Sequence, residues 1–173
     1  MRPTAVVAGI AGIVVLAVGC VPDAAERNKE TVRRMIEAVN ARDFDALDEL
    51  IAEDIHRHSG ATAGVTVENL QQFKDFLHQD LAAVPDAEQE IHFMLAQDDH
   101  VAVYLTYRGT QQGQLGPFPP SNARVEIPFI GILRLEDSKI AEMWVEWDNL
   151  NALTQLGHFP PPAQTDSVAD ASR

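Results

Sequence analysis

The stretch KIAEMWVEWDNLNALTQLG, residues 139–157, predicts a strand that runs directly into a short helix. Its first half alternates, and because successive side chains of a strand point to opposite faces, two faces can be assigned. One face carries Ile140, Glu142, Trp144, Glu146 and Asp148, and the other carries Ala141, Met143, Val145 and Trp147. A face that combines Trp with carboxylates is typical of a pocket with an aromatic wall around ionisable groups. Asp148 can also cap the helix that Gly157 ends.

The rest of the chain divides into a helical half and a half with strand periodicity. Apolar residues at helical spacing predict three helices, over residues 23–40, 44–51 and 67–83. Thr66 is the predicted cap of the third helix, and Pro85 follows its end. From residue 88 onward the period is two, which predicts four strands, over residues 88–97, 100–110, 123–135 and 139–147. Helices followed by an antiparallel meander predict an α+β fold with the helices packed on one curved sheet.

Length and charge restrict the classes of partner. A chain of 173 residues can hold one domain with a substantial core, which we expect over residues 28–160. The proline-rich and then small, polar residues 161–173 predict a disordered tail. The formal net charge of −13 argues against nucleic acid as a partner and against a basic patch that docks on anionic lipid.

The N-terminal residues are typical of an export signal. Arg2 precedes an apolar run that ends at Cys20, the single cysteine of the chain. The segment before Cys20 is similar to a bacterial lipobox, which predicts a signal peptide over residues 1–19, lipidation of Cys20 and a linker over residues 20–27. We therefore expect an exported lipoprotein anchored to a membrane of the cell envelope. An uncleaved membrane anchor and simple secretion are the alternatives, although the run reaches only the lower length limit for a span.

The C-terminal motif carries a family resemblance. Glu142-x-Trp144, Asp148 and Gln155-Leu156-Gly157 resemble the signature of the SnoaL-like polyketide cyclases. Further matches span residues 28–160 and include Gly109-Thr110, Gly113, Pro120 and the segment 134–140. That family belongs to the α+β proteins related to nuclear transport factor 2. The resemblance implies a cone-shaped barrel, made of a curved, mostly antiparallel sheet with N-terminal helices packed over it.

The resemblance also implies a reaction. In SnoaL-like cyclases the Asp of this motif acts as general acid/base in an intramolecular aldol closure, which assigns that role to Asp148. One carboxylate with a raised pKa in a dry pocket is sufficient to deprotonate a carbon flanked by carbonyls. No metal or organic cofactor is expected. The substrate implied is a small, mostly apolar carbonyl compound, with Trp144 as the pocket wall and Glu142 near the base.

Further polar residues are candidates for the same pocket. His56 and His58 face the same way on an extended segment, and the resemblance places such a His at the pocket mouth; exposed loop positions are the alternative. As a metal pair they lack a third ligand. Tyr104 and Arg108 share one strand face with Thr106, which we expect to be a polar pocket wall. Whether His92 faces the pocket or solvent is left open by its position.

The sequence departs from the family pattern at the substrate end of the pocket. The family has Arg at the place of Tyr104, His at Gln111 and Thr-Gly-Lys at residues 121–123. Two functions therefore remain, a cofactor-independent cyclase or isomerase and a module that binds a hydrophobic ligand without turnover. A surface location favours the second, because polyketide intermediates are made in the cytoplasm. A third role is dimerisation, since the outer sheet face of such barrels pairs with a second copy.

Overall fold

The computed structural model describes residues 23–62 and 64–160. The chain runs through nine helices and strands in that part. In order they are α1 (Ala24–Ala41), α2 (Leu47–Leu50), β1 (Ile51–His58), α3 (Leu70–Ala83), β2 (Glu88–Gln97), β3 (His100–Thr110), β4 (Arg124–Glu136), β5 (Lys139–Trp147) and α4 (Asn149–Gln155). The predicted signal peptide, Cys20 and the tail lie outside the described residues.

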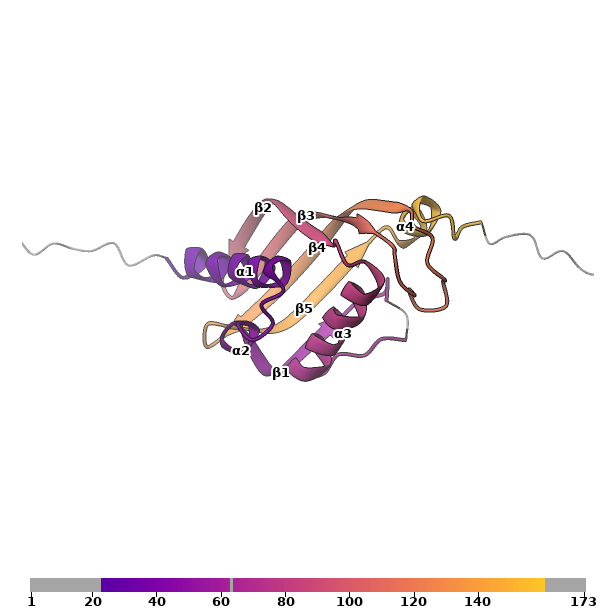
Figure 1. Ribbon diagram of the computed structural model, residues 1–173. Helices are drawn as coiled ribbons and strands as arrows, with labels where there is room; N and C mark the ends of the chain where they lie inside the picture. The colour runs from indigo at the N-terminus through magenta and orange to yellow at the C-terminus, as the bar shows by residue number, and fades with distance from the viewer. Residues whose placement is uncertain (1–22, 63, 161–173) are drawn as a thin grey trace, which may run out of the picture.

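One five-stranded sheet organises the domain. Its strand order is β1-β5-β4-β3-β2, in which β1 runs parallel to β5 and all other pairs are antiparallel. The sheet is curved but not closed, and α1, α2 and α3 lie over one of its faces (Figure 1). We call this covered face the inner face and the opposite one the outer face. The predicted α+β class is confirmed.

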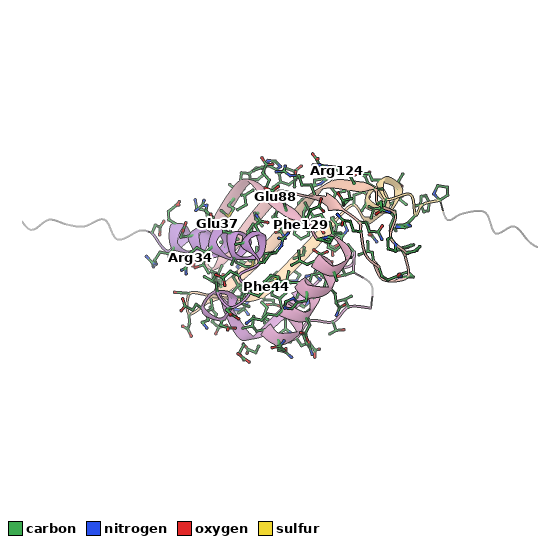
Figure 2. The ribbon with its side chains drawn as sticks, in the orientation of Figure 1. Arg34, Glu37, Phe44, Glu88, Arg124 and Phe129 are labelled. Carbon is green, nitrogen blue, oxygen red and sulfur yellow. The ribbon has the colours of Figure 1, made fainter. Side chains whose placement is uncertain are left out.

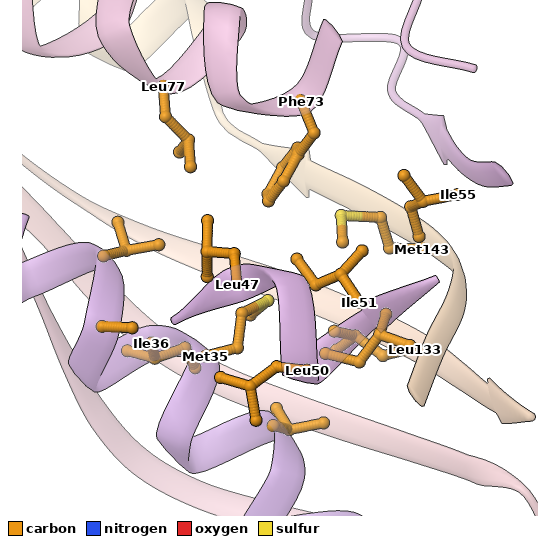
Figure 3. Close-up of a cluster of buried hydrophobic side chains, with 14 of the residues drawn as sticks. Met35, Ile36, Leu47, Leu50, Ile51, Ile55, Phe73, Leu77, Leu133 and Met143 are labelled. Carbon is orange, nitrogen blue, oxygen red and sulfur yellow. The ribbon is translucent and has the colours of Figure 1, made fainter. Parts of the chain in front are cut away.

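The hydrophobic core fills the space between the three helices and the inner face. Side chains from α1, α2, α3, β1, β4 and β5 meet there (Figure 3). Leu47, Ile51 and Ile55 are fully buried, because α2 leads directly into β1 beneath α3. Figure 2 shows the contrast with Arg34 and Glu37, which are exposed on α1. Burial of this apolar face is the main stabilising contribution to the fold.

The predicted elements agree with the observed ones except at three places. The second helix, predicted over residues 44–51, is only the single turn Leu47–Leu50. The segment 51–58, which the sequence did not assign to the sheet, is strand β1. The third helix begins at Leu70 instead of Val67, because the Asn69 side chain accepts a hydrogen bond from the Gln72 N–H and caps it. Thr66 is therefore not the cap, and Val67 forms an isolated bridge with Arg57 instead.

Two glycines that carry the family resemblance are explained by close packing. A Cβ at Gly109 would collide with the Val84 side chain, and one at Gly113 with the Ala82 carbonyl oxygen. The end of β3 and the following loop can thus approach the end of α3 only without side chains.

None of the described helices is long and apolar enough to cross a membrane.

Candidate functional site

The predicted pocket face of β5 is the outer face of the sheet. Trp144 is 37% exposed there, and Glu146 is also exposed, whereas Met143 and Val145 are buried on the inner face. The alternation was predicted correctly from Glu142 to Trp147, whereas Ile140, which was assigned to the Trp144 face, is fully buried in the core because the pairing with β4 is irregular beside it. The assignment of Trp144 as a pocket wall is also wrong. All three helices that build the core lie on the other side of the sheet, so this face has no cover among the described residues.

Asp148 does not lie in an enclosed hollow. Its side chain is exposed at the N-terminus of α4, where it accepts a hydrogen bond of 2.9 Å from the Asn151 N–H. The expectation of a dry environment for this carboxylate is therefore wrong, and the helix cap that the sequence also predicted is what its geometry provides.

His58 and Glu142 meet on the outer face. The His58 Nε2 lies 2.9 Å from a Glu142 carboxylate oxygen, and its ring stacks on Trp144 with centroids 5.3 Å apart. Arg134 donates to the other oxygen of Glu142. The bond from His58 and the neighbouring Arg134 charge hold the pKa of Glu142 below its usual range. This cluster is half exposed, and it lies on the side opposite the core.

The other predicted pocket residues also lie outside. His56 is exposed, and His92 is exposed with a hydrogen bond of 2.8 Å to the Thr106 hydroxyl. Tyr104 packs against His92 and Phe93, and Arg108 forms ion pairs with Glu88 and Glu90. The expected polar pocket wall on β3 is therefore part of the outer surface, because the apolar side of the strand faces the helices.

A polar group that the sequence reading missed lies on the inner face. Asp80 of α3 accepts a hydrogen bond from the Tyr107 hydroxyl of β3, which lies 3.1 and 3.2 Å from the two carboxylate oxygens. Burial of the carboxyl raises the pKa of Asp80 to about 6, although the Tyr107 hydroxyl and the charges of Arg42 and Arg57 act in the opposite direction. Burial and the Asp80 charge likewise raise the pKa of Tyr107.

Arg57 of β1 completes this group. Its side chain is buried, with the guanidinium 4.5 Å from the centre of the Phe76 ring, an arrangement that favours a cation. It donates a hydrogen bond of 3.0 Å to the Thr62 hydroxyl. Burial lowers the pKa of Arg57, while Glu146 and Asp80 raise it. Because Phe76 and Asp80 are one helical turn apart on α3, Arg57 and Tyr107 contact the same side of that helix.

Two further aromatic rings pack against the core from β4 and β5. Trp147 stacks on Phe129 with ring centroids 5.6 Å apart, and both are partly buried against the core. Tyr107 and Trp147 also pack on the smaller apolar cluster beneath α4. We call Arg57, Phe76, Asp80, Tyr107 and Trp147 the inner-face site. Its half-buried rings and its carboxyl with a raised pKa are the combination that the sequence predicted for the face of Trp144 and Asp148, whereas the buried cation was not predicted.

The space at Asp80 is small. The hollow lined by Asp80, Tyr107, Arg42 and neighbouring apolar residues has a volume of about 10 Å³. That is room for about one water molecule. A larger compound reaches the Asp80 carboxyl only if α3 or the end of α1 moves away from the sheet.

The sequence contains a signal for each missed residue. Asp80 lies three residues after Leu77 and seven after Phe73, so it belongs to the apolar side of α3. Arg57 lies six residues after Ile51 and two after Ile55, so the alternation of β1 places it on the same face as these buried residues. A charged residue at a core position is rare, and each of these two departs from the apolar pattern of its element.

Gln111, one of the departures from the family pattern, has a structural role. It is fully buried, and its side-chain oxygen accepts from the Ser121 hydroxyl and from the His158 Nε2 at 2.7 Å. Its amide donates to the Pro119 carbonyl. Gln111 and Ser121, which stand where the family has His and Thr, thus connect the 111–122 loop to the segment after α4. Among the described residues, no group of three or more His, Cys, Asp or Glu is placed to hold a metal ion.

Comparison with known proteins agrees with this fold. Two similar solved structures are IdmH of Streptomyces antibioticus, named as a candidate polyketide cyclase, and AclR of Streptomyces galilaeus, named as a candidate hydroxylase. IdmH is 29% identical with a TM-score of 0.68, covering 75% of this chain and 98% of its own. AclR is 26% identical with a TM-score of 0.69, covering 79% and 100%.

A SnoaL-like polyketide cyclase candidate of Jannaschia sp. CCS1 has a TM-score of 0.72 at 24% identity, covering 82% of this chain and 100% of its own, and supports the fold alone. No curated protein matches the chain significantly. The sequence profile described as SnoaL-like polyketide cyclase matches residues 29–156, which is most of the described domain. The chain therefore belongs to the SnoaL-like polyketide cyclase family.

Proposed function

We propose that this protein is a cofactor-independent cyclase or isomerase that acts on a small apolar carbonyl compound, with Asp80 as its general acid/base. Family membership supports a reaction of the cyclase or isomerase type. The observation that carries the assignment is the Asp80 carboxyl, whose burial raises its pKa to about 6 beside half-buried aromatic rings. A base with a pKa near the working pH is both available in its ionised form and strong enough to accept a proton.

The proposed reaction needs only this carboxyl group. Ionised Asp80 removes a proton from a carbon flanked by two carbonyls, and the resulting enolate carbon attacks a further carbonyl carbon of the same molecule. The new alkoxide then takes the proton back from Asp80, so the product is an isomer of the substrate and the enzyme is unchanged. Tyr107 positions the carboxyl through its hydroxyl, and Phe76 and Trp147 provide apolar contact area.

The test compares two carboxylates. The purified full chain is incubated with a panel of 1,3-diketones and polyketo esters, and Asp80→Asn is compared with Asp148→Asn as the matched control. We expect a loss of about 100-fold or more in turnover for Asp80→Asn and a change within about threefold for Asp148→Asn. The reverse result would overturn the assignment and return the acid/base role to Asp148, the position that the family motif indicates.

A binding module is the second candidate function. The expected location at a membrane of the cell envelope favours it, because polyketide intermediates are made in the cytoplasm. The hollow of about 10 Å³ at Asp80 admits neither a substrate nor a ligand without rearrangement. Tight binding of an apolar ligand by the wild-type chain, unchanged in Asp80→Asn and without turnover of any panel compound, would establish this alternative in place of catalysis.

We further propose that the protein is an exported lipoprotein anchored to a membrane through Cys20. The support is the position of Cys20 at the end of the N-terminal apolar run. Cells that express the wild type and Cys20→Ser are fractionated. The wild type is expected in the membrane fraction and the variant in the soluble exported fraction; a variant that stays in the membrane refutes lipid anchoring.

We also propose a homodimer that uses the outer face. Large apolar side chains are exposed there on β2, β4 and β5: Phe93, Leu95, Ile130, Ile132 and Trp144. Exposed apolar areas of this kind mark interaction sites. Light scattering of Ile132→Lys should give a monomer mass, while Leu150→Lys on α4 should stay dimeric. A monomeric wild type at all concentrations contradicts this proposal.

A further inference from the structure

Arg57 is a buried cation that the proposed acid/base chemistry does not use. Only 8% of its surface is exposed, yet it forms no ion pair with any carboxylate of the described residues. Asp80 and Glu146 act on it only at longer range. Phe76 and Thr62 compensate only part of the hydration that buried Arg57 loses, so an opposite charge that arrives from outside would be stabilised beside it.

The guanidinium also has unused hydrogen-bond donors. Its described side-chain bond goes from one terminal nitrogen to Thr62, which leaves most of its N–H groups without a protein acceptor. Among the described residues, the Ser59 hydroxyl oxygen is the one side-chain polar atom that is both fully buried and without a hydrogen-bond partner. The nitrogens of Arg57 that have no protein acceptor are therefore not fully buried, and their N–H donors keep some accessible surface.

Ser59 is the second, independent observation. Its hydroxyl oxygen is buried and makes no hydrogen bond. Ser59 follows directly after β1, two residues from Arg57, and positions two apart in an extended chain point to the same side. An unsatisfied buried hydroxyl is unfavourable in the free protein, and an acceptor that binds beside Arg57 would relieve that penalty.

We propose that Arg57 and Ser59 form an anion subsite of the inner-face site, which binds the carboxylate of an apolar, aromatic-sized ligand. Arg57 offers a planar fork that matches a carboxylate, and the Ser59 hydroxyl adds one further donor. Phe76 and Trp147 contact the apolar body of the ligand. The substrate class thus narrows to a carbonyl compound that carries a carboxylate. This inference rests on the proposed function for its catalytic meaning, but the binding itself does not require turnover.

The test uses two nearly isosteric probes, 2-naphthylacetate and 2-naphthylacetamide, whose binding to the full chain is measured by calorimetry at pH 7.5. Wild type should bind the carboxylate about tenfold or more tightly than the amide, as charge-assisted bonds to Arg imply. Arg57→Met should abolish this preference while leaving amide affinity within about threefold. Equal affinity of wild type for both probes, or no carboxylate binding at millimolar concentration, would overturn the inference.

Ser59→Ala covers the case in which Arg57→Met fails to fold. Because the hydroxyl has no partner in the free protein, this variant should be at least as stable as wild type yet lose about threefold or more in carboxylate affinity. Unchanged carboxylate affinity would show that Ser59 is only an unsatisfied buried group and would remove it from the subsite.

Asp80→Asn separates this inference from the proposed function. It should keep the preference for the carboxylate and bind it more tightly, because a negative charge that acts on Arg57 is removed. A carboxylate preference retained in Asp80→Asn, together with no turnover of any panel compound by the wild type, supports the anion subsite and refutes catalysis. Asp80-dependent turnover of neutral compounds, with no preference for the carboxylate probe, supports catalysis and refutes the subsite.

Discussion

The two faces of the sheet carry similar residues under different physical conditions. On the outer face, Arg134, Glu142 and His58 form a partly exposed chain of hydrogen bonds that water can replace. On the inner face, Arg57 and Asp80 are desolvated. Burial lowers the pKa of Arg57 and raises that of Asp80, so it favours the neutral form of each. The same kinds of side chain are therefore weakly constrained outside and strongly perturbed inside. Perturbed groups of the second kind are the ones that can perform chemistry.

The largest difference between the faces should appear in stability. Leu133 and Ile132 are adjacent in β4, but Leu133 is 3% exposed in the core and Ile132 is 43% exposed outside. We expect Leu133→Ala to lower the free energy of unfolding by about 3 kcal/mol, through lost burial and a cavity, and Ile132→Ala by under about 1 kcal/mol. Urea unfolding of both variants measures this. Equal losses would contradict the assignment of inner and outer face.

The second largest difference between the faces is expected in the pH dependence of stability. The folded-state pKa of Asp80, about 6, lies above its ordinary value of 3.8. The contribution of protonated Asp80 to the free energy of unfolding is therefore fully present below about pH 4. It is lost as the pH rises through 6, and the loss amounts to up to about 3 kcal/mol. The difference in unfolding free energy between wild type and Asp80→Asn should fall across this window. A difference that stays constant from pH 4 to 7 contradicts the raised pKa.

A smaller effect is expected at Asp148. Because its carboxylate caps α4, Asp148→Ala should cost about 1 kcal/mol of stability, while Asp148→Ser, which keeps a capping oxygen, should cost less. Thermal unfolding of the two variants gives the comparison. Equal losses for Ala and Ser would show that the side chain does not act as a cap.

The smallest effect is expected for the outer pair of His58 and Glu142. A double-mutant cycle with His58→Ala and Glu142→Gln should give a coupling under about 1 kcal/mol, because water competes for both groups. The lowered pKa of Glu142 means that this contribution is present above the ordinary pKa of a Glu and is lost as the pH falls. A coupling that survives at pH 3 or in high salt would contradict this explanation.

The fold was largely predictable, whereas the site was not. Local patterns predicted the helices and four of the five strands nearly to their ends, because apolar periodicity reflects burial directly. β1 was missed since its pairing with β5 is parallel and distant in sequence. The predicted site residues share one face, as expected, but that face is the outer one. Trp144 among carboxylates is compatible with a pocket and with a partly exposed surface, so its pattern could not decide between them.

By itself, the sequence determined the α+β class, the family and the alternation of β5 from Glu142 onward, because these depend on local periodicity and on motif residues that are close in the chain. Only the tertiary structure decided which face of the sheet the helices cover. That choice depends on the packing of α1, α2 and α3 against strands far away in sequence. The same packing desolvates Asp80 and Arg57, and desolvation, which no short stretch of sequence specifies, is what shifts their pKa values.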